Sequence, residues 1–196
     1  MKNKYVNRSK ISEAKFRELV RFYSLDLTAL QIAELTGLNR NTVNRYLTEI
    51  RKKITGFTEA ASPVSILPPS IKVVEEVDQY LILIKEEGTE IFTDVINKSN
   101  HYVIRQIEGQ YDLVIDMETG KHQYIGGDKN HRDSSRRKLN RIKSFWGNVK
   151  SRLSKFKGIH ASTFRLHLKE CEFRHNNRNE DLYQLLLKIL RNNPLF

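Results

Sequence analysis

The chain has 196 residues, enough for one medium domain or two small ones, and its 34 Lys and Arg against 23 Asp and Glu give a net charge of +11. This excess of positive charge favours a phosphate-rich partner, because binding releases the counterions of the phosphates; a basic surface without a specific partner is the alternative. A single cysteine, Cys171, excludes an intrachain disulfide and CxxC-type metal sites, and no apolar run reaches the ~18 residues of a membrane span, so we expect a cytoplasmic protein without membrane association.

Three helices are predicted over residues 12–54, after a loose basic arm at residues 1–10. Ser12 can cap the first of them. The apolar residues of this helix recur at helical spacing and are Phe16, Leu19, Val20 and Tyr23. This spacing predicts that one side of the helix is buried.

The segment ALQIAELTGLNRNTVNRYL has the pattern of a helix-turn-helix, with helices expected at 28–36 and 40–53. Ala33 is small where two helices cross, Gly37 can adopt the positive φ of a tight turn, and Asn39 can cap the following helix. The inward stripe consists of Ile32, Leu38, Val43 and Leu47. Because these features occur together, they favour a DNA-binding motif over an ordinary helical hairpin.

In such a motif the helix that begins at Arg40 enters the major groove of DNA. The exposed residues near its start are Arg40, Asn41, Thr42, Asn44 and Arg45. Arginine can pair bidentately with guanine and asparagine with adenine, so we expect this set to read base edges. Lys52 and Lys53 are expected to contact phosphates, which adds affinity but little sequence information. For each residue alone a solvated face is an equal alternative.

The stretch GFTEAASPVSILPPS contains three of the four prolines, so a linker is predicted at residues 55–70. A β-rich region follows it. Its expected elements are strands before and after a turn at Glu86–Gly88, a short helix at 99–108, and a hairpin of 111–116 with 121–127. The hairpin is expected to turn around Glu118–Gly120.

The last third of the chain is predicted to be helical, with helices at 138–156, 161–175 and 179–192. Between His131 and Lys157 it has ten Lys and Arg and a single acid. A solvated face is one interpretation, but we expect this region to bind phosphates. The candidate residues are Arg137, Arg141, Lys143, Lys150 and Arg152. The interleaved aromatic residues have the spacing of the apolar side and are expected in the core: Phe145, Trp146 and Phe156.

The segment TALQIAELTGLNRNTVNRYLTEIRKKI and the tail motifs KFKGI, LHLKECEFRHNNR and NEDLY resemble bacterial insertion-sequence transposases of the ISXO-two-like group. The resemblance implies an α+β chain. A three-helix helix-turn-helix domain would occupy residues 1–54. After the linker at 55–70, a reduced ribonuclease-H-like α/β domain would occupy 71–196 and end in C-terminal helices. A DDE-type enzyme of this family uses acidic residues to hold two metal ions for DNA cleavage and strand transfer.

The resemblance allows each expected acid to be sought in this sequence. Asp78 is a weak candidate for the first, because the residues after it depart from the family pattern. The strand that should carry the second acid is missing, and the nearby acids lack the right context: Glu108, Asp112 and Asp116. The third belongs in a helix where Asn140, Ile142, Phe145 and Trp146 keep their places, but Lys143 stands at the acid position.

Lys143 and the length of this region argue against a working metal site. An ammonium group cannot ligate a divalent cation while protonated, and it would repel one. The 65 residues between Asp78 and Lys143 (143 − 78) are fewer than the roughly 75 that four strands, two helices and their connections need. We therefore expect no cofactor, and Mg²⁺ or Mn²⁺ only if the catalytic site is intact after all.

Three functions follow from these observations. The preferred one is a DNA-binding protein of the transposase lineage that recognises specific double-stranded DNA, such as the ends of an insertion element, without strand transfer. The alternative is an active DDE-type transposase. A second alternative is a transcriptional regulator in which residues 71–127 sense a ligand or mediate dimers. The sequence leaves the DNA sequence and the formation of a homodimer open.

Overall fold

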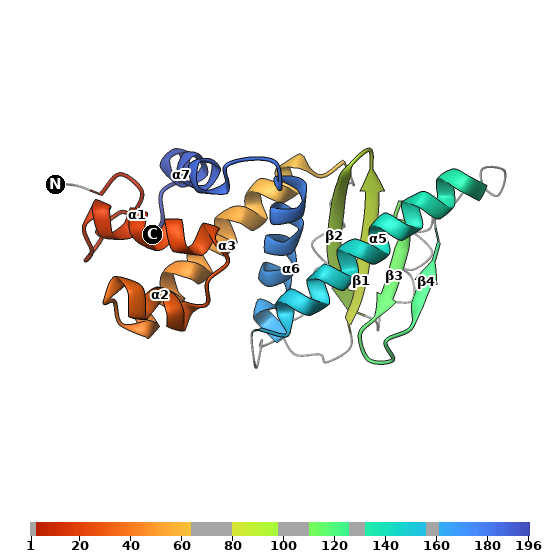
Figure 1. The fold of residues 1–196 in the computed structure, drawn as a ribbon, viewed down its shortest axis with the longest axis horizontal. Coiled ribbons are helices and arrows are strands. Elements are labelled where there is room, and N and C mark those ends of the chain that lie inside the picture. Colours follow the sequence, from red (N-terminus) through yellow and green to blue (C-terminus); the bar gives the residue numbers. More distant parts are fainter. Residues whose placement is uncertain (1–2, 64–79, 98–109, 126–131, 156–160) are drawn as a thin grey trace. The chain divides into compact units, whose positions relative to one another are not determined.

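The computed structural model describes residues 3–63, 80–97, 110–125, 132–155 and 161–196. These residues form six helices and four strands (Figure 1), and the chain divides into two compact units, which are described one at a time. No helix within the described residues is both long and apolar enough to cross a membrane.

The first unit comprises residues 1–60 and 177–196. Its helices are α1 (Glu13–Ser24), α2 (Ala29–Thr36), α3 (Arg40–Ala61) and α7 (Leu182–Asn192). The sequence placed the last helix in a domain of residues 71–196, but α7 packs against α1. The apolar side of α7 fits this position, since it buries Leu186, Leu187 and Leu190.

Helix α3 is longer than its sequence pattern predicted. It continues past Lys53 to Ala61, and therefore through the first part of the stretch expected as a linker. Buried Ile54 and Thr58 extend its inward side beyond the predicted end. The helix ends two residues before Pro63, as expected from the restriction that a proline places on the residue before it.

The N-terminal segment is not a loose arm, contrary to our expectation. Val6 and Leu195 form a parallel β-bridge, in which Asn7 N donates to Leu195 O (2.9 Å) and Leu195 N donates to Tyr5 O (2.9 Å). Tyr5 is buried, and its ring packs 5.9 Å from that of Phe16 in α1. Residues 5–7 are thus paired with Leu195 within the first unit.

The second unit comprises residues 61–176 and contains a four-stranded sheet. The strands are β1 (Tyr80–Glu87), β2 (Glu90–Asn97), β3 (Leu113–Asp116) and β4 (His122–Tyr124), in the order β2-β1-β3-β4. All three pairings are antiparallel. Both predicted hairpins are confirmed, and each turn has a glycine with positive φ, Gly88 at 63° and Gly120 at 66°.

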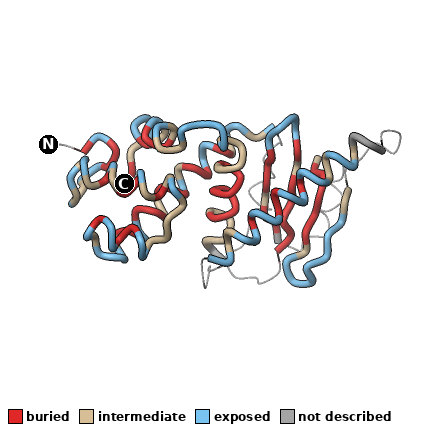
Figure 2. The backbone as a smooth tube through the Cα atoms, in the orientation of Figure 1, coloured by how far each residue is buried: buried red, intermediate tan, exposed pale blue. Residues whose placement is uncertain are grey.

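Helices α5 (Arg132–Leu153) and α6 (Ala161–Asn176) pack on one face of this sheet. Figure 1 shows α5 crossing the strands. Figure 2 shows that buried and exposed residues alternate along this helix. Phe145 and Trp146 are buried in the core between helices and sheet, as predicted. Phe156 and the short helix expected at 99–108 lie outside the described residues.

An antiparallel sheet with helices on one face is an α+β arrangement, which agrees with the predicted class. The described strands include no parallel pair, whereas an α/β domain is built on parallel strands connected by helices. The part of the chain that the structure describes therefore supports α+β, but not the α/β arrangement expected for residues 71–196.

The motif LHLKECEFRHNNR lies in α6 except for its last two residues, and it carries two buried carboxylates. Glu170 Oε1 accepts from Arg152 Nη2 (2.6 Å) and Arg174 Nε (3.0 Å). Glu172 Oε2 accepts from both the backbone N and the hydroxyl of Thr93, and from Lys169 Nζ (2.9 Å). Burial raises the pKa of Glu172 against the opposing effect of Lys169 and Thr93. Glu172 Oε1 is buried without a hydrogen-bond partner, but the bonds of Glu170 and of Glu172 Oε2 connect α6 to α5 and to the sheet.

The end of α6 also pairs with the edge of the sheet. Asn176 Nδ2 donates to Ile91 O (2.8 Å), and Asn176 Oδ1 accepts from Ile91 N (2.9 Å). The side-chain amide thus makes the two hydrogen bonds that a neighbouring strand would make to β2. This pairing satisfies an edge backbone position that would otherwise be open to another strand.

Candidate nucleic-acid interface

A tight turn at Gly37 joins α2 to α3. A capping box begins α2. The Thr28 side chain accepts from Gln31 N, and Gln31 Oε1 accepts from Thr28 N at 2.9 Å. Gly37 has a φ of 68°, and Asn39 Oδ1 accepts from Asn41 N (2.8 Å) at the start of α3. The predicted glycine turn and asparagine cap are both confirmed, and together they fix where α3 begins.

The inward side of this pair of helices is packed. Ile32, Val43 and Leu47 are buried and Leu38 is half-buried, as the predicted stripe requires. Ala33, which was expected at a helix crossing, is also buried. Because this side is packed into the core of the unit, the opposite side of α3 remains available for a partner.

The exposed side of α3 begins with the residues predicted to read bases. Arg40, Asn41, Asn44 and Arg45 are exposed, and Thr42 is half-buried. Within the described part of the chain, the side chains of Arg40 and Asn44 make no hydrogen bond or ion pair. Two donors at the start of a helix, where the backbone also presents free N–H groups, suit an anionic or hydrogen-bonding partner.

The lysines farther along α3 are already engaged. Lys52 Nζ lies 2.7 Å from Glu49 Oε1, and Lys53 Nζ donates to Asn193 Oδ1 at 2.7 Å. Lys52 remains exposed, but Glu49 offsets its charge. The positive charge of α3 is therefore concentrated near its first turns.

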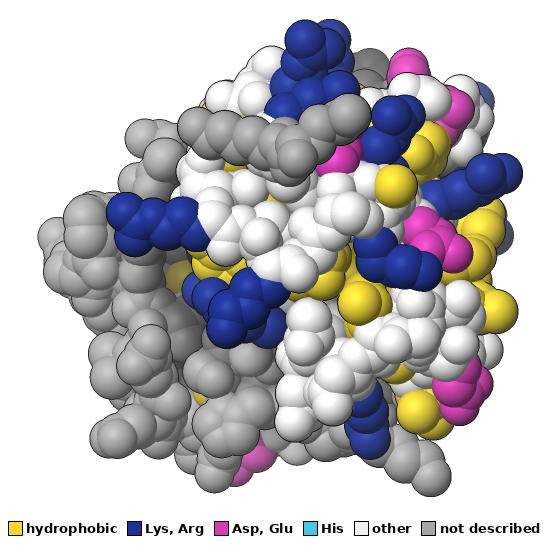
Figure 3. Space-filling view, turned by 90° about the vertical axis from the view of Figure 1, so that its left-hand side faces the viewer, with side chains coloured by type: hydrophobic (Ala, Val, Ile, Leu, Met, Phe, Trp, Pro, Cys, Tyr) yellow, Lys and Arg dark blue, Asp and Glu magenta, His cyan; other side chains and the backbone are white. Residues whose placement is uncertain are grey.

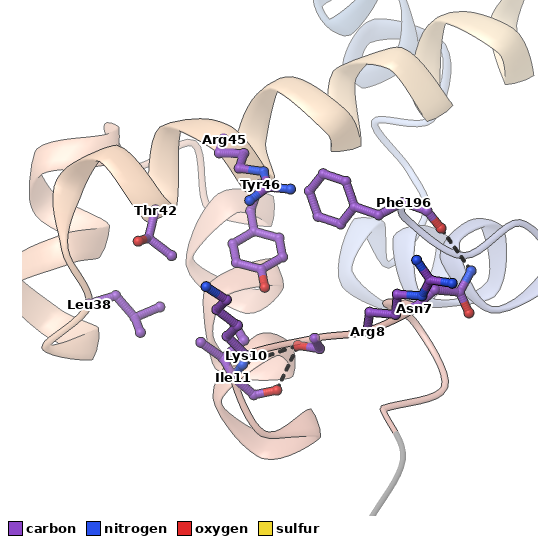
Figure 4. Close-up of a pocket in the computed structure, with 10 residues that line it drawn as sticks. Asn7, Arg8, Lys10, Ile11, Leu38, Thr42, Arg45, Tyr46 and Phe196 are labelled. Carbon is purple, nitrogen blue, oxygen red and sulfur yellow. Dashed lines mark hydrogen bonds between the residues drawn. The ribbon is translucent and has the colours of Figure 1, made fainter.

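A hollow of about 890 Å³ lies beside these first turns (Figure 4). Its wall combines Leu38, Thr42, Arg45 and Tyr46 with residues 7–11 and Phe196. Three of its side chains are cationic, and none is acidic: Arg8, Lys10 and Arg45. Sequence reasoning placed Arg45 near DNA but missed the other two, because long-range contacts such as the β-bridge with Leu195 hold the N-terminal segment in this place.

A second hollow of about 620 Å³ lies between the N-terminal segment, α1 and α7. Its cations are Lys4, Arg17, Lys188 and Arg191. Lys4 pairs with Glu13 at 3.2 Å, and Arg17 Nε donates to Tyr183 Oη at 3.4 Å. The face drawn in Figure 3 carries Lys and Arg side chains in several places, with uncharged side chains and some Asp and Glu among them.

The outer side of α5 is basic, as predicted. Arg136, Arg137, Lys143 and Lys150 are exposed, and within the described residues none of them has a carboxylate partner. Arg141 is different, because it forms an ion pair with Glu86 of β1. Arg137, Lys143 and Lys150 are thus free to contact phosphates, whereas Arg141 would have to share its charge.

Arg152 does not fit its predicted role. Only 11% of its side chain is exposed, and Nη2 lies 2.6 Å from Oε1 of Glu170, whose side chain is fully buried. Its Nη1 also donates to Cys171 Sγ at 3.4 Å. The expectation that Arg152 binds DNA is therefore revised: its guanidinium neutralises a buried carboxylate, which leaves no charge for a phosphate.

Two carboxylates of the sheet are also bound by cations of α5. Asp112 Oδ2 accepts from Glu86 N (2.8 Å), and Asp112 Oδ1 lies 2.7 Å from Lys138 Nζ. Glu86 is paired with Arg141. Burial raises the pKa of Tyr124, and the charges of Asp112 and Glu86 raise it further. This cluster is neutralised by side chains of the unit itself.

The acids implied by the family resemblance do not form a two-metal site in the described residues. Asp78 and Glu108 lie outside them, and Asp116 Oδ1 accepts from the backbone of the turn at Glu118 (2.9 Å). No group of three His, Cys, Asp or Glu side chains within the described ranges could hold a metal ion. Among the described candidates, Asp112 is bound by Lys138 and Lys143 is exposed.

Comparison with known proteins gives one local similarity. Over 39 residues the chain is 51% identical to an uncharacterized transposase-like protein of Haemophilus influenzae, strain Rd. The matched stretch is 20% of this chain and 32% of that relative, so the chain spans about a third of the curated relative that it matches. No family model matches the chain, and no solved structure matches it. The similarity supports a relation to transposases.

Proposed function

We propose that this chain is a transposase-related protein that binds double-stranded DNA. In this proposal α2 and α3 form a helix-turn-helix, and α3 is the recognition helix that enters the major groove. The observation that carries the proposal is the start of α3, where a glycine turn and an asparagine cap present Arg40, Asn41 and Asn44 to solvent. The local identity to a transposase-like protein supports the same lineage.

Base reading is assigned to the residues of this face that have no partner of their own. Arg40 can donate two hydrogen bonds to guanine, and Asn44 can pair with adenine. Exposed Arg137, Lys143 and Lys150 of α5 would add phosphate contacts from the second unit. Such contacts are electrostatic, so they raise affinity for all DNA sequences by a similar factor.

The proposal also holds that the chain does not catalyse strand transfer. It is supported by the lysine at the expected position of the third acid and by the ion pairs that occupy Asp112 and Glu86. A ribonuclease-H-like origin of the second unit stays part of the proposal, because Phe145 and Trp146 keep their places in the motif that carries the resemblance and lie in the core between helices and sheet. The antiparallel pairing of β1 with β3 departs from an α/β plan.

The proposal is tested by selecting bound duplexes from a random pool with the purified chain and measuring affinity for the enriched and a scrambled duplex. Arg40→Ala should weaken binding to the enriched duplex by roughly 5- to 150-fold, which corresponds to the 1–3 kcal/mol of one bidentate pair, and weaken binding to the scrambled duplex much less. An equal loss on both duplexes would remove Arg40 from base reading. No binding to any duplex would end the proposal.

Strand transfer is tested on the same duplex with Mn²⁺ or Mg²⁺. The preferred function predicts a gel shift without nicks. Nicks that depend on the metal and disappear in Asp78→Ala would instead support an active DDE-type transposase. Binding restricted to promoter DNA, with no affinity for the ends of insertion elements, would support a transcriptional regulator.

A further inference from the structure

We propose that the hollow beside the first turns of α3 binds one phosphodiester group of the DNA backbone and thereby sets the register of α3 on the duplex. The inference rests on the proposed function, and it assigns a separate role to the residues that surround the hollow. Arg8, Lys10 and Arg45 supply its charge, and Thr42 supplies a hydroxyl donor. A phosphate oxygen carries negative charge and several lone pairs, which matches this set of donors.

The cations of the hollow are not used inside the protein. Arg8 and Lys10 are both exposed, and within the described residues their side chains form neither an ion pair nor a hydrogen bond. Arg45 also has no carboxylate partner there. Three cationic side chains line one hollow that has no acidic side chain, so an anion bound in it would be stabilised. Figure 4 shows Lys10 and Arg45 on either side of Tyr46.

Arg45 is positioned by an aromatic ring. Its guanidinium carbon lies 4.3 Å from the centroid of the Phe196 ring, and this ring packs edge-on against Tyr46 at 5.8 Å. A guanidinium stacked on an aromatic face keeps its N–H groups free at the edge. Arg45 is therefore held toward the wall of the hollow, which favours a phosphate contact over the base reading expected from the sequence.

The backbone at Arg8 gives independent support. Its φ is 49°, in the left-handed region that residues other than glycine and asparagine seldom adopt. Bonds on both sides hold the segment, with Asn7 Nδ2 donating to Phe196 O (2.9 Å) and Ile11 N donating to Ser9 Oγ (3.2 Å). Glycine would adopt this backbone conformation with less strain than arginine. We therefore attribute the arginine at this position to the phosphate contact of its side chain.

The test uses the full chain, the enriched duplex and the scrambled duplex, with affinity measured over a series of KCl concentrations. Arg8→Ala with Lys10→Ala should weaken both duplexes by roughly tenfold or more. The slope of log K against log salt should flatten by about one, because each phosphate contact contributes about 0.9. The charge-matched control is Lys15→Ala with Arg21→Ala, on α1 and outside the hollow, which should change neither quantity as much.

A scan with single methylphosphonates locates the phosphate. One position should weaken the wild-type chain when neutralised and have no further effect on the double variant of Arg8 and Lys10. If every position affects both proteins equally, or the double variant behaves like its control, the inference is overturned while the proposed function stands. If the wild-type chain binds no duplex, the inference and the proposed function are both overturned. The inference is also overturned if the double variant loses as much affinity for a single-stranded oligonucleotide as for the duplex, because the site would then not require duplex geometry.

Discussion

The guanidinium of Arg45 stacks on the ring of Phe196, at 4.3 Å from carbon to centroid. This contact joins the start of α3 to the last residue of the printed sequence, which the bridge between Val6 and Leu195 holds in the first unit. The face of α3 therefore depends on both ends of the sequence. A DNA-binding surface with restrained side chains loses less conformational entropy on binding than one with free side chains.

Phe196→Ala should weaken DNA binding although it removes no charge. Arg45 would lose its stacking partner, which is worth about 0.5–1 kcal/mol at an exposed site. We expect a two- to fivefold loss of affinity with an unchanged slope against salt, measured by fluorescence anisotropy. The control is Leu25→Ala, since Leu25 is also an exposed large apolar residue (63%) of the first unit. A flattened slope for Phe196→Ala would mean that a charged contact was lost instead.

Arg8→Gly should separate stability from binding. Glycine adopts positive φ without strain, whereas a residue with a Cβ pays of order 1 kcal/mol there. We expect the free energy of unfolding in urea to rise by up to about 1 kcal/mol while DNA affinity falls. Arg8→Ala loses the same charge but keeps the Cβ, so it should bind as weakly without becoming more stable. Equal stability of the two variants would show that the backbone at this position is not strained.

Lys150→Ala and Arg152→Ala should differ, although the residues are two apart in a basic run. Lys150 is exposed, so its loss should flatten the salt slope by about one and leave stability within about 0.5 kcal/mol. Arg152 shares buried Glu170 with Arg174, so its loss should lower the free energy of unfolding by roughly 1.5–3 kcal/mol, the range of a hydrogen bond to a charged group. Denaturation in urea and binding titrations on both variants check this. Similar results for both would place Arg152 at the surface.

Features set by neighbouring residues were predicted well from the sequence. The cap by Ser12, the turn at Gly37 and the cap by Asn39 each depend on backbone groups within three residues. The turn of the β3–β4 hairpin is equally local. Its Gly120 N donates to Asp116 O at 2.8 Å. Such elements follow from propensity and turn chemistry, which act over a few residues.

Features set by distant residues were not predicted. Nothing near Arg8 or Lys10 in the sequence indicates that Phe196 lies beside them. The role of Arg152 depends on Glu170, which is eighteen residues away in the sequence. Charge alone cannot distinguish a lysine that faces solvent from an arginine that faces a buried carboxylate. The candidate phosphate ligands of α5 could therefore be assigned only after their partners were known.

Cys171 should react slowly in the native protein. Burial raises the pKa of its thiol, an effect that the neighbouring Arg152 only partly opposes, so the thiol stays protonated at pH values where an ordinary cysteine ionises. The free energy of unfolding should accordingly fall once the pH exceeds the ordinary thiol value, because the unfolded chain loses that proton first. Labelling with a thiol reagent at pH 8.5 should be slow without urea and fast in urea. Fast labelling of the folded protein would mean that the sulfur is accessible.

Two glycine substitutions should have opposite signs, and they test whether the turn before α3 sets its position. A Cβ at Gly37 would meet no atom within 4 Å, so Gly37→Ala introduces only the strain of a φ of 68°, about 1–2 kcal/mol. Gly56 is equally open but lies inside α3 without positive φ, so Gly56→Ala should stabilise the protein by about 0.5–1 kcal/mol. Urea denaturation measures both. If α3 is the recognition helix, Gly37→Ala should also weaken binding to the enriched duplex under conditions where it stays folded, and Gly56→Ala should not. Stabilisation by both substitutions would show that the turn at Gly37 does not require glycine.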